Sequence, residues 1–311
     1  NWNTSNVTTM KEMFRNAGGF AIDINTYDNK WNVSKVTDMT RMFNDTHAFD
    51  HNISAWDTGN VITMAQMFKS SIFNQNISNW DTREVLDMSA MFNNNQIFNQ
   101  SIDTDGNKWN VAKVTNMSSM FANAKAFDKD ISDWDTTKVS NMESMFNTAI
   151  LFNQDLNNWD VSSVTNMREM FRFADAFNNG DVGNNEANSL NDWNTVSVTS
   201  MSNLFGYCTK FNQDIGGWNT SSVTSMGQMF DVAREFNQDI GGWNTSSLKN
   251  IARMFSDANS FNNGDNEGES NNPLNWEDTS KITGSLGGTF HGAESFNQDI
   301  GGWDTSRITN M

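Results

Sequence analysis

Tryptophans recur through the chain at a nearly fixed interval. The commonest spacing is 25 residues, and nearly all of the other spacings are 25 plus an insertion. A fixed period in this range is the sequence signature of a solenoid or array, in which each repeat packs against its neighbours. The chain is therefore predicted to be a single continuous solenoid over residues 1–311, with about 11–12 coils, and a fragment of a longer array. The twelve tryptophans are Trp2, Trp31, Trp56, Trp80, Trp109, Trp134, Trp159, Trp193, Trp218, Trp243, Trp276 and Trp303.

Apolar residues within one repeat follow helical spacing. The run Met142, Met145, Phe146, Ala149 and Phe152 advances in steps of 3, 1, 3 and 3. Such steps place the residues on one face of a short helix. The stretch that follows, up to the next tryptophan, has an extended character. We therefore expect an α/β repeat, a leucine-rich-repeat-like solenoid with one short strand and one short helix per coil.

A single repeat is too small to fold alone. Eight apolar side chains per coil contribute on the order of 15 kcal/mol if fully buried, at roughly 2 kcal/mol each. Ordering the backbone costs roughly 1 to 2 kcal/mol per residue, which is more than one coil recovers by itself. Neighbouring coils must complete the burial, so we expect equivalent side chains to lie above one another in ladders of Phe, Met and Trp.

Charge and composition exclude several classes of partner. The formal net charge is −17, from 37 acidic against 20 basic residues. Such a surface repels nucleic acid and anionic lipid, and it attracts cations and basic partners. The longest apolar runs are far shorter than the roughly 18 residues of a membrane helix, so we expect no direct membrane insertion by this segment.

Several segments carry a family resemblance. Residues 218–226, the Met229-Phe230 pair and residues 236–240 together resemble BspA-type leucine-rich-repeat surface proteins. They are most similar to the branch with a repeat of roughly 25 residues, a bacterial surface protein repeat that is also found in mycoplasma surface lipoproteins. The resemblance implies a leucine-rich-repeat-like solenoid, secretion or surface display, and roles in adhesion or protein interaction. It implies no catalytic residues.

Polar and acidic insertions follow every third tryptophan, after Trp2, Trp80, Trp159 and Trp243. Insertions in a solenoid map to loops on one face. Duplication of a three-coil block explains them without any function, whereas contact with a partner or a neighbouring fibre would make them functional. The candidate partner-binding residues in these loops are Asp181, Glu186, Asp265, Glu267 and Glu269.

Calcium binding is a third reading of the insertions. Hard cations require clustered oxygen ligands on a tight turn. The segment around Gly106 resembles the start of such a loop, although the distal bidentate Glu of an EF-hand is absent. The candidate calcium ligands are Asp103, Asp105, Asn107, Asp23 and Asp28.

An Asn-Gln-Asp motif recurs before several tryptophans. An inward amide in each coil would form an Asn or Gln ladder that satisfies backbone groups. Outward carboxylates in line would instead form a binding strip. The aspartates of the motif are Asp155, Asp214, Asp239 and Asp299.

Other recurring residues favour structural roles. The nineteen methionines fall at helical slots and are expected in the core. Cys208 occupies a slot that otherwise holds alanine, which predicts a buried and inert thiol. His47 and His51 could be a metal pair, but a surface turn explains them better. A threonine recurs just after most Trp-Asn/Asp pairs, with Val33, Val111 and Val161 interrupting the row, and turn and cap chemistry explains this row better than ice binding.

No combination of residues points to catalysis, since the chain lacks a spaced Ser/His/Asp set, a phosphate loop and a metal-ligand cluster. We expect a non-catalytic, extracellular or cell-surface solenoid that acts as an adhesion or protein-interaction surface. Its partner would be a protein or glycan surface. The alternative is a structural subunit of an extracellular filament, sheath or appendage, which would self-associate into fibres.

Overall fold

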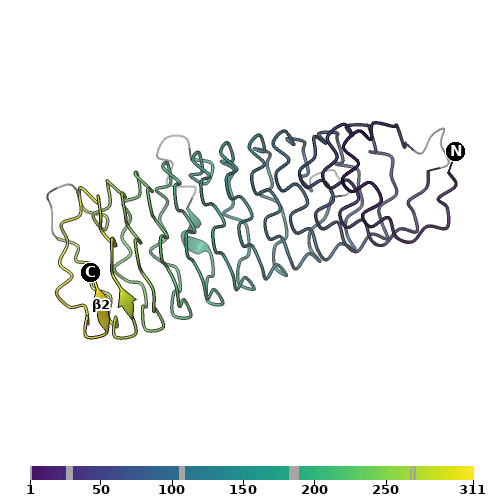
Figure 1. The fold of residues 1–311 in the computed structure, drawn as a ribbon. Coiled ribbons are helices and arrows are strands. Elements are labelled where there is room, and N and C mark those ends of the chain that lie inside the picture. Colours follow the sequence, from purple (N-terminus) through teal and green to yellow (C-terminus); the bar gives the residue numbers. More distant parts are fainter. Residues whose placement is uncertain (1, 26–30, 105–108, 182–188, 267, 269–270) are drawn as a thin grey trace. The chain divides into compact units, whose positions relative to one another are not determined.

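The structure is a computed structural model that describes residues 2–25, 31–104, 109–181, 189–266, 268 and 271–311. The chain divides into two compact units, unit 1 (Asn1–Gln154) and unit 2 (Asp155–Met311). Regular secondary structure is sparse in the described ranges. It comprises the 3-10 helix η1 (Leu190–Asp192) and the strands β1 (Gly284–Ser285) and β2 (Ile308–Asn310), which pair in parallel (Figure 1).

The predicted α/β repeat, with a leucine-rich-repeat-like strand and helix in each coil, is wrong. The described residues contain no α-helix. The segment that was expected to be helical is a run of β-turns instead. In the second repeat, the N–H of Met42 donates to the carbonyl of Met39 at 3.1 Å, and the N–H of Asn44 donates to that of Arg41 at 3.2 Å. These i→i+3 bonds close four-residue turns.

The same segment bonds to the next coil at every second residue. The N–H groups of Arg41 and Phe43 donate to the carbonyls of Ala65 and Met67, each at 2.9 Å. An α-helix would direct those N–H groups to its own carbonyls four residues back. The backbone therefore satisfies its hydrogen bonds partly between coils, which explains why helical spacing of side chains occurs here without a helix.

Two residues per coil in this segment have left-handed backbone conformations. In the second repeat they are Arg41, with φ of 57°, and Asp45, with φ of 59°. Positive φ is uncommon outside glycine because the Cβ atom crowds the following carbonyl. The conformation nevertheless recurs in almost every coil, and in the last described one glycines occupy both positions, Gly288 and Gly292.

The strand was also predicted at the wrong place. The only strand-like pairing common to the described coils is a single parallel bridge. It lies two residues after a buried valine, such as Val36 or Val61, and outside the Asn-Gln-Asp segment. In unit 1 this ladder of bridges runs Thr9, Asp38, Thr63, Asp87, Asn116, Asn141, and in unit 2 it runs Asn166, Ser200, Ser225, Asn250.

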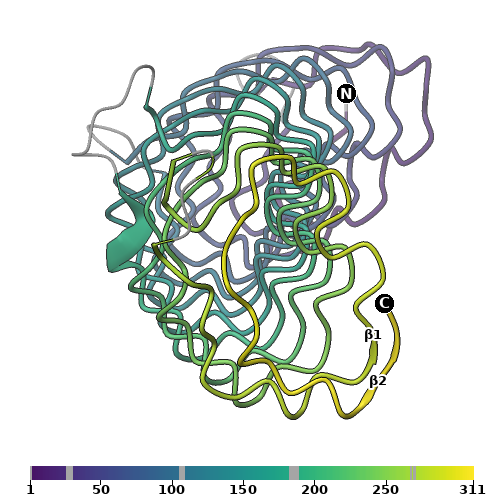
Figure 2. The same ribbon diagram turned by 90° about the vertical axis from the view of Figure 1, so that its left-hand side faces the viewer.

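The predicted side-chain ladders are confirmed within each unit. The indoles of Trp56 and Trp80 stack with centroids 6.1 Å apart and planes 1° apart, and the rings of Phe43 and Phe68 stack at 5.6 Å. In unit 2, Trp218 and Trp243 stack at 6.4 Å. Figure 2 shows the teal-to-yellow coils of unit 2 following similar paths one behind another. All of the methionines except Met13 and Met311 are buried with these rings, as their spacing predicted.

Candidate functional site

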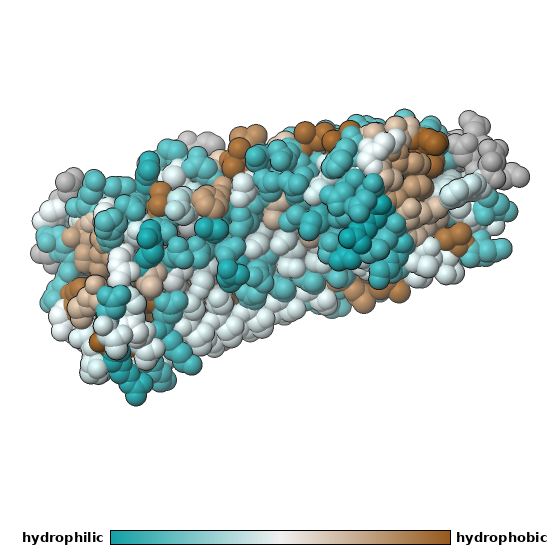
Figure 3. Space-filling model, in the orientation of Figure 1, coloured by the Kyte–Doolittle hydropathy of each residue, from teal (hydrophilic) through white to brown (hydrophobic). Residues whose placement is uncertain are grey.

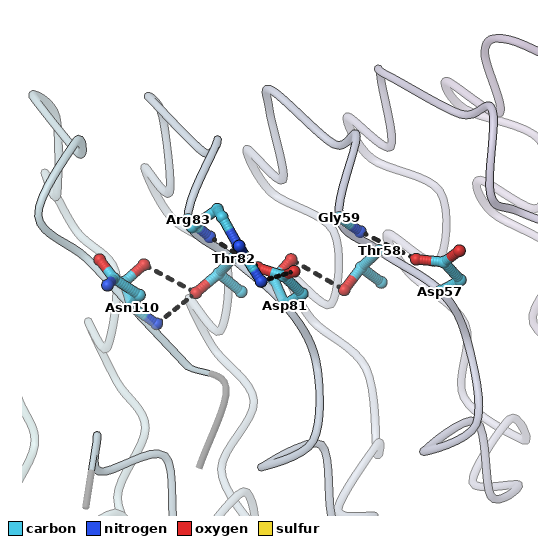
Figure 4. A network of polar contacts seen from close by, with 7 residues as sticks. All are labelled: Asp57, Thr58, Gly59, Asp81, Thr82, Arg83 and Asn110. Atoms are coloured by element: carbon cyan, nitrogen blue, oxygen red, sulfur yellow. Dashed lines mark hydrogen bonds and ion pairs between the residues drawn. The ribbon is translucent and has the colours of Figure 1, made fainter.

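The recurring threonines join neighbouring coils. The buried Thr58 hydroxyl donates to the carbonyl of Asp81 at 3.0 Å (Figure 4). The Thr82 hydroxyl donates to the carbonyl of Asn110 at 2.7 Å and accepts the Asn110 N–H at 2.6 Å. Because these hydroxyls are buried and used internally, the threonine row offers no flat outer surface to ice.

The amides of the Asn-Gln-Asp motif form the predicted inward ladder. The side-chain oxygen of Asn212 accepts the N–H of Asn237 at 2.8 Å, and that of Asn237 accepts the N–H of Asn262 at 2.7 Å. The Gln238 amide donates to the Asn212 carbonyl at 2.8 Å. Side-chain amides therefore hold the coils together in the stretch where a backbone strand was expected.

The aspartates of the motif cap turns. Each side chain accepts the backbone N–H two residues later, at 2.9 Å for Asp155, Asp214 and Asp239 and at 2.7 Å for Asp299. Asp155 is half-buried and the other three are exposed. Only Asp214 and Asp239 lie in adjacent coils, because Ser189 and Pro273 occupy the slot in the coils between the others. The carboxylates therefore do not form a continuous strip.

The acidic insertions are described only in part. Asp265 closes its own loop, since its carboxylate accepts the N–H groups of Asn271 at 2.7 Å and Asn272 at 2.9 Å. The half-buried Asp181 donates its N–H to the carbonyl of Asn178 at 3.0 Å. The candidate partner-binding residues Glu186, Glu267 and Glu269 lie outside the described residues.

The candidate calcium ligands do not come together in the described ranges. Asp103 accepts a hydrogen bond from the Ser101 hydroxyl, and Asp23 accepts two from Asn25, from its N–H at 2.9 Å and its side-chain amide at 2.7 Å. No group of three or more His, Cys, Asp or Glu side chains in the described part of the chain is arranged to hold a metal ion. The other candidate ligands, Asp105, Asn107 and Asp28, fall outside the described residues.

Reactive side chains have structural partners. Burial raises the pKa of the Cys208 thiol well above its usual value, and the thiol donates to the carbonyl of Phe171 at 2.7 Å. This is the inert thiol that the sequence predicts. A ring nitrogen of His51 lies 2.7 Å from the carbonyl oxygen of Ala21, in keeping with a structural role for that histidine.

An exposed apolar row in unit 1 was missed by the sequence analysis. It consists of Ile72, Ile97, Ile150 and Leu151, which are 38%, 47%, 40% and 55% exposed. Ile72, Ile97 and Leu151 immediately precede the second phenylalanine of their coils, Ile150 lies one residue further back, and Ala126 holds the slot in the coil between Ile97 and Leu151. Figure 3 shows that apolar side chains are exposed among polar ones on the face of the molecule that it draws. A shallow hollow of about 240 Å³ lies against Ile72 and Ile97, and His47, Asn94 and Gln96 contribute to its rim. We call these four residues the Ile72 row.

The signal for this row was present in the sequence. The slot before the second phenylalanine holds an apolar residue at Ile72, Ile97 and Leu151. In unit 2 the same slot holds Ala176 and then polar residues, among them Lys210 and Glu235, which form an ion pair with a 2.5 Å contact. A slot that takes large apolar residues in some coils and charged residues in others is not a core position, and that contrast identifies it as surface.

Bulky aromatic residues occupy left-handed positions in unit 2. Phe173 has φ of 60° and Tyr207 has φ of 63°, and their ring centroids are 4.4 Å apart. The guanidinium carbon of Arg172 lies 4.4 Å from the Phe173 ring centroid, within cation–π range. Both rings are partly exposed. Asparagine or glycine would adopt this backbone conformation at lower cost, so the backbone does not explain why aromatic residues occupy these two positions.

A family model described as "Mycoplasma protein of unknown function, DUF285" matches residues 1–30, 29–106, 103–188, 181–272 and 265–311. No curated protein matches the chain. A solved structure described as "Crystal structure of TLR13-ssRNA13 complex" shares 10% identity over 92% of this chain, with a TM-score of 0.30. This chain covers 48% of the length of that one, and so weak a likeness carries no argument.

No helix in the described ranges has the length and hydropathy needed to cross a membrane. The family matches overlap one another and together run the length of the sequence, in register with the tryptophan repeat. The chain belongs to the DUF285 family of mycoplasma proteins.

Proposed function

We propose that this chain is a non-catalytic, cell-surface interaction module that binds a protein partner through the Ile72 row. The proposal places it outside the cell, with the display and adhesion roles of BspA-type surface proteins. The observation that carries the proposal is the row itself. Four of the seven large aliphatic side chains that are exposed in the described part of unit 1 belong to this row, although the coils have a buried interior that takes residues of the same kind.

The rest of the coil surface supports this choice. Recurring threonines, amides and capping aspartates are engaged in bonds within or between coils, as shown by Thr82, Asn212 and Asp239. The aliphatic side chains of the Ile72 row form no hydrogen bonds within or between coils. Apolar side chains beside a polar-rimmed hollow are typical of a protein contact. The net charge of −17 favours a partner whose apolar contact segment has basic flanks.

The experiment compares two matched double variants. Ile72→Ser with Ile97→Ser removes the centre of the row. Ile62→Ser with Leu86→Ser removes two aliphatic side chains of similar exposure, 45% and 44%, from the bridge ladder on another part of unit 1. Fluorescently labelled protein is applied to cultured epithelial cells that are untreated, protease-treated or glycosidase-treated.

We expect binding that protease treatment removes and glycosidase treatment leaves intact. The Ile72/Ile97 variant should lose most of it, and the Ile62/Leu86 variant should bind like wild type. Equal binding by both variants would refute the role of the row. Absence of cell binding together with concentration-dependent fibres in electron microscopy would favour the filament alternative.

A further inference from the structure

The hollow beside the Ile72 row is formed by side chains from three neighbouring coils of unit 1. It has a volume of about 240 Å³, and the residues that line it are His47, Ser70, Ser71, Ile72, Asn94, Gln96 and Ile97. Ile72 and Ile97 belong to adjacent coils, and both are exposed. The hollow therefore offers a partner an apolar recess between two isoleucines.

The polar side chains around the hollow mostly bind other groups of the protein. The buried Ser71 hydroxyl donates to the carbonyl of Phe68 at 2.9 Å. The amide of Asn94 donates to the Ser70 hydroxyl at 3.1 Å, and its oxygen accepts the Gln96 amide at 3.4 Å. A polar side chain that entered the hollow would give up its bonds to water and find few free partners, which is unfavourable.

The charge of the lining is also informative. No acid, lysine or arginine is among the residues that line the hollow, and its one histidine, His47, is exposed to solvent. A charged side chain would therefore enter without an oppositely charged partner, and nothing there would offset the cost of its desolvation. A large apolar side chain would instead displace water from the surfaces of Ile72 and Ile97, which is favourable.

We propose that the protein partner anchors itself by inserting one large, uncharged apolar side chain between Ile72 and Ile97. This inference rests on the proposed function, because it states how the partner of the Ile72 row is held. An apolar anchor that fills a pocket typically carries a large share of the binding energy of a protein interface. Ile150 and Leu151 lie beyond the Ala126 coil and contact the partner outside the anchor.

Filling the hollow separates an anchor site from a flat apolar surface. Gln96 lines the hollow, so Gln96→Phe fills it with a ring and also adds apolar area. A flat surface would bind at least as tightly after this change, whereas an anchor site would be blocked. The matched control is Asn259→Phe, which replaces another neutral amide with the same ring at the equivalent slot of unit 2, two residues before Phe261. Neither position has positive φ.

Both variants are labelled and applied to the untreated epithelial cells of the first experiment. We expect Gln96→Phe to bind at least ~10-fold more weakly than wild type, and Asn259→Phe to bind like wild type. Matching melting temperatures for the two variants would show that the loss does not come from unfolding. Equal or tighter binding by Gln96→Phe would overturn the anchor, and the role of the row would still stand if Ile72→Ser with Ile97→Ser lost binding.

A second measurement needs no cells. The isoleucine methyl groups are labelled for NMR, and the amides of N-acetyl-leucine, N-acetyl-phenylalanine and N-acetyl-lysine are titrated in turn. The leucine and phenylalanine amides should shift the methyl signals of Ile72 and Ile97 saturably and leave the exposed Ile62 unchanged, and Gln96→Phe should abolish the shifts. Equal shifts with the lysine amide, or none with any of the three, would show that the hollow does not take an apolar side chain, whatever the cells bind.

Discussion

The indole Nε1 of Trp80 donates a 3.0 Å hydrogen bond to the carbonyl of Ile53 in the preceding coil. Equivalent bonds join Trp218 to Leu190 at 2.8 Å and Trp243 to Ile215 at 3.1 Å. The tryptophan that marks the repeat thus has two roles. Its ring stacks on its neighbours, and its indole N–H gives a second hydrogen bond to a carbonyl that already accepts a backbone N–H, as the Ile53 carbonyl does from Trp56 at 3.1 Å.

Trp80→Phe should destabilise the protein by about 2–4 kcal/mol, because it removes buried ring volume and one of the two hydrogen bonds that the Ile53 carbonyl accepts. Trp109→Phe is the matched control. Trp109 is equally buried, but its indole nitrogen has no partner among the described residues, so only the packing loss applies. Urea unfolding should give a clearly smaller loss for Trp109→Phe, and equal losses would contradict a role for the hydrogen bond.

Val232→Asn should raise the free energy of unfolding by about 1 kcal/mol. Val232 has φ of 61°, where a β-branched side chain is crowded and asparagine is tolerated. The same substitution at Val196, an exposed residue without positive φ, should change stability by less than about 0.5 kcal/mol. Chemical denaturation of both variants measures the difference, and a destabilised Val232→Asn would show that the left-handed position is not strained.

Thr82→Val should cost about 1–3 kcal/mol, because it keeps the shape of the side chain and leaves both the N–H and the carbonyl of Asn110 without their partner. Thr115→Val is the control, since that hydroxyl is exposed and makes a single 3.3 Å bond to the Leu86 carbonyl. Thermal unfolding should separate the two variants by several degrees. A neutral Thr82→Val would mean that the threonine row does not hold the coils together.

Acid should weaken the turns that are capped by aspartate. Hydrogen bonds from the hydroxyl and the N–H of Ser162 lower the pKa of Asp160. A carboxyl whose pKa is lower in the folded state stabilises the fold above its unfolded pKa of about 3.9, and this contribution is lost as the pH falls through the folded pKa. NMR titration should give a midpoint for Asp160 below its usual value, and Ser162→Ala should raise it. An unchanged midpoint in Ser162→Ala would contradict the assignment.

The Cys208 thiol should not react with thiol reagents in the folded protein, even at pH 9. Its side chain is fully buried, and burial raises its pKa, so neither access nor thiolate is present. A colorimetric thiol assay should report no free thiol in buffer and one thiol per chain in urea. Rapid labelling without denaturant would reveal local opening of the coil around Ala174 and Cys208.

The sequence was sufficient to predict the repeat, the buried slots and the stacking of equivalent rings, because these depend only on which residues are apolar and how far apart they lie. It failed at the Met-Phe segment. Steps of 3, 1 and 3 bring Met39, Met42, Phe43 and Thr46 to one side in a helix, and they do the same in successive β-turns. Spacing alone cannot separate the two, since the difference lies in whether Phe43 bonds within its coil or to Met67 of the next.

The candidate binding residues were predicted less well for a related reason. Acidic side chains such as Asp239 attract attention in a sequence, yet their geometry shows that they cap turns. The Ile72 row could have been found by comparing the slot before the second phenylalanine from coil to coil, but the exposed fractions of its side chains come only from the structure.

The backbone, and not the side chain, sets the conformation of the two left-handed positions in each coil. The backbone adopts the same conformation whether the position carries Glu12, Ala90, Phe173 or Val232, so intercoil hydrogen bonds rather than side-chain identity impose it. Residues at these sites can therefore be exchanged without a change of fold, at a cost of about 1 kcal/mol that depends on how well each residue tolerates positive φ. A scaffold of this kind suits directed evolution, with a library randomised at these positions and the ring ladders left untouched.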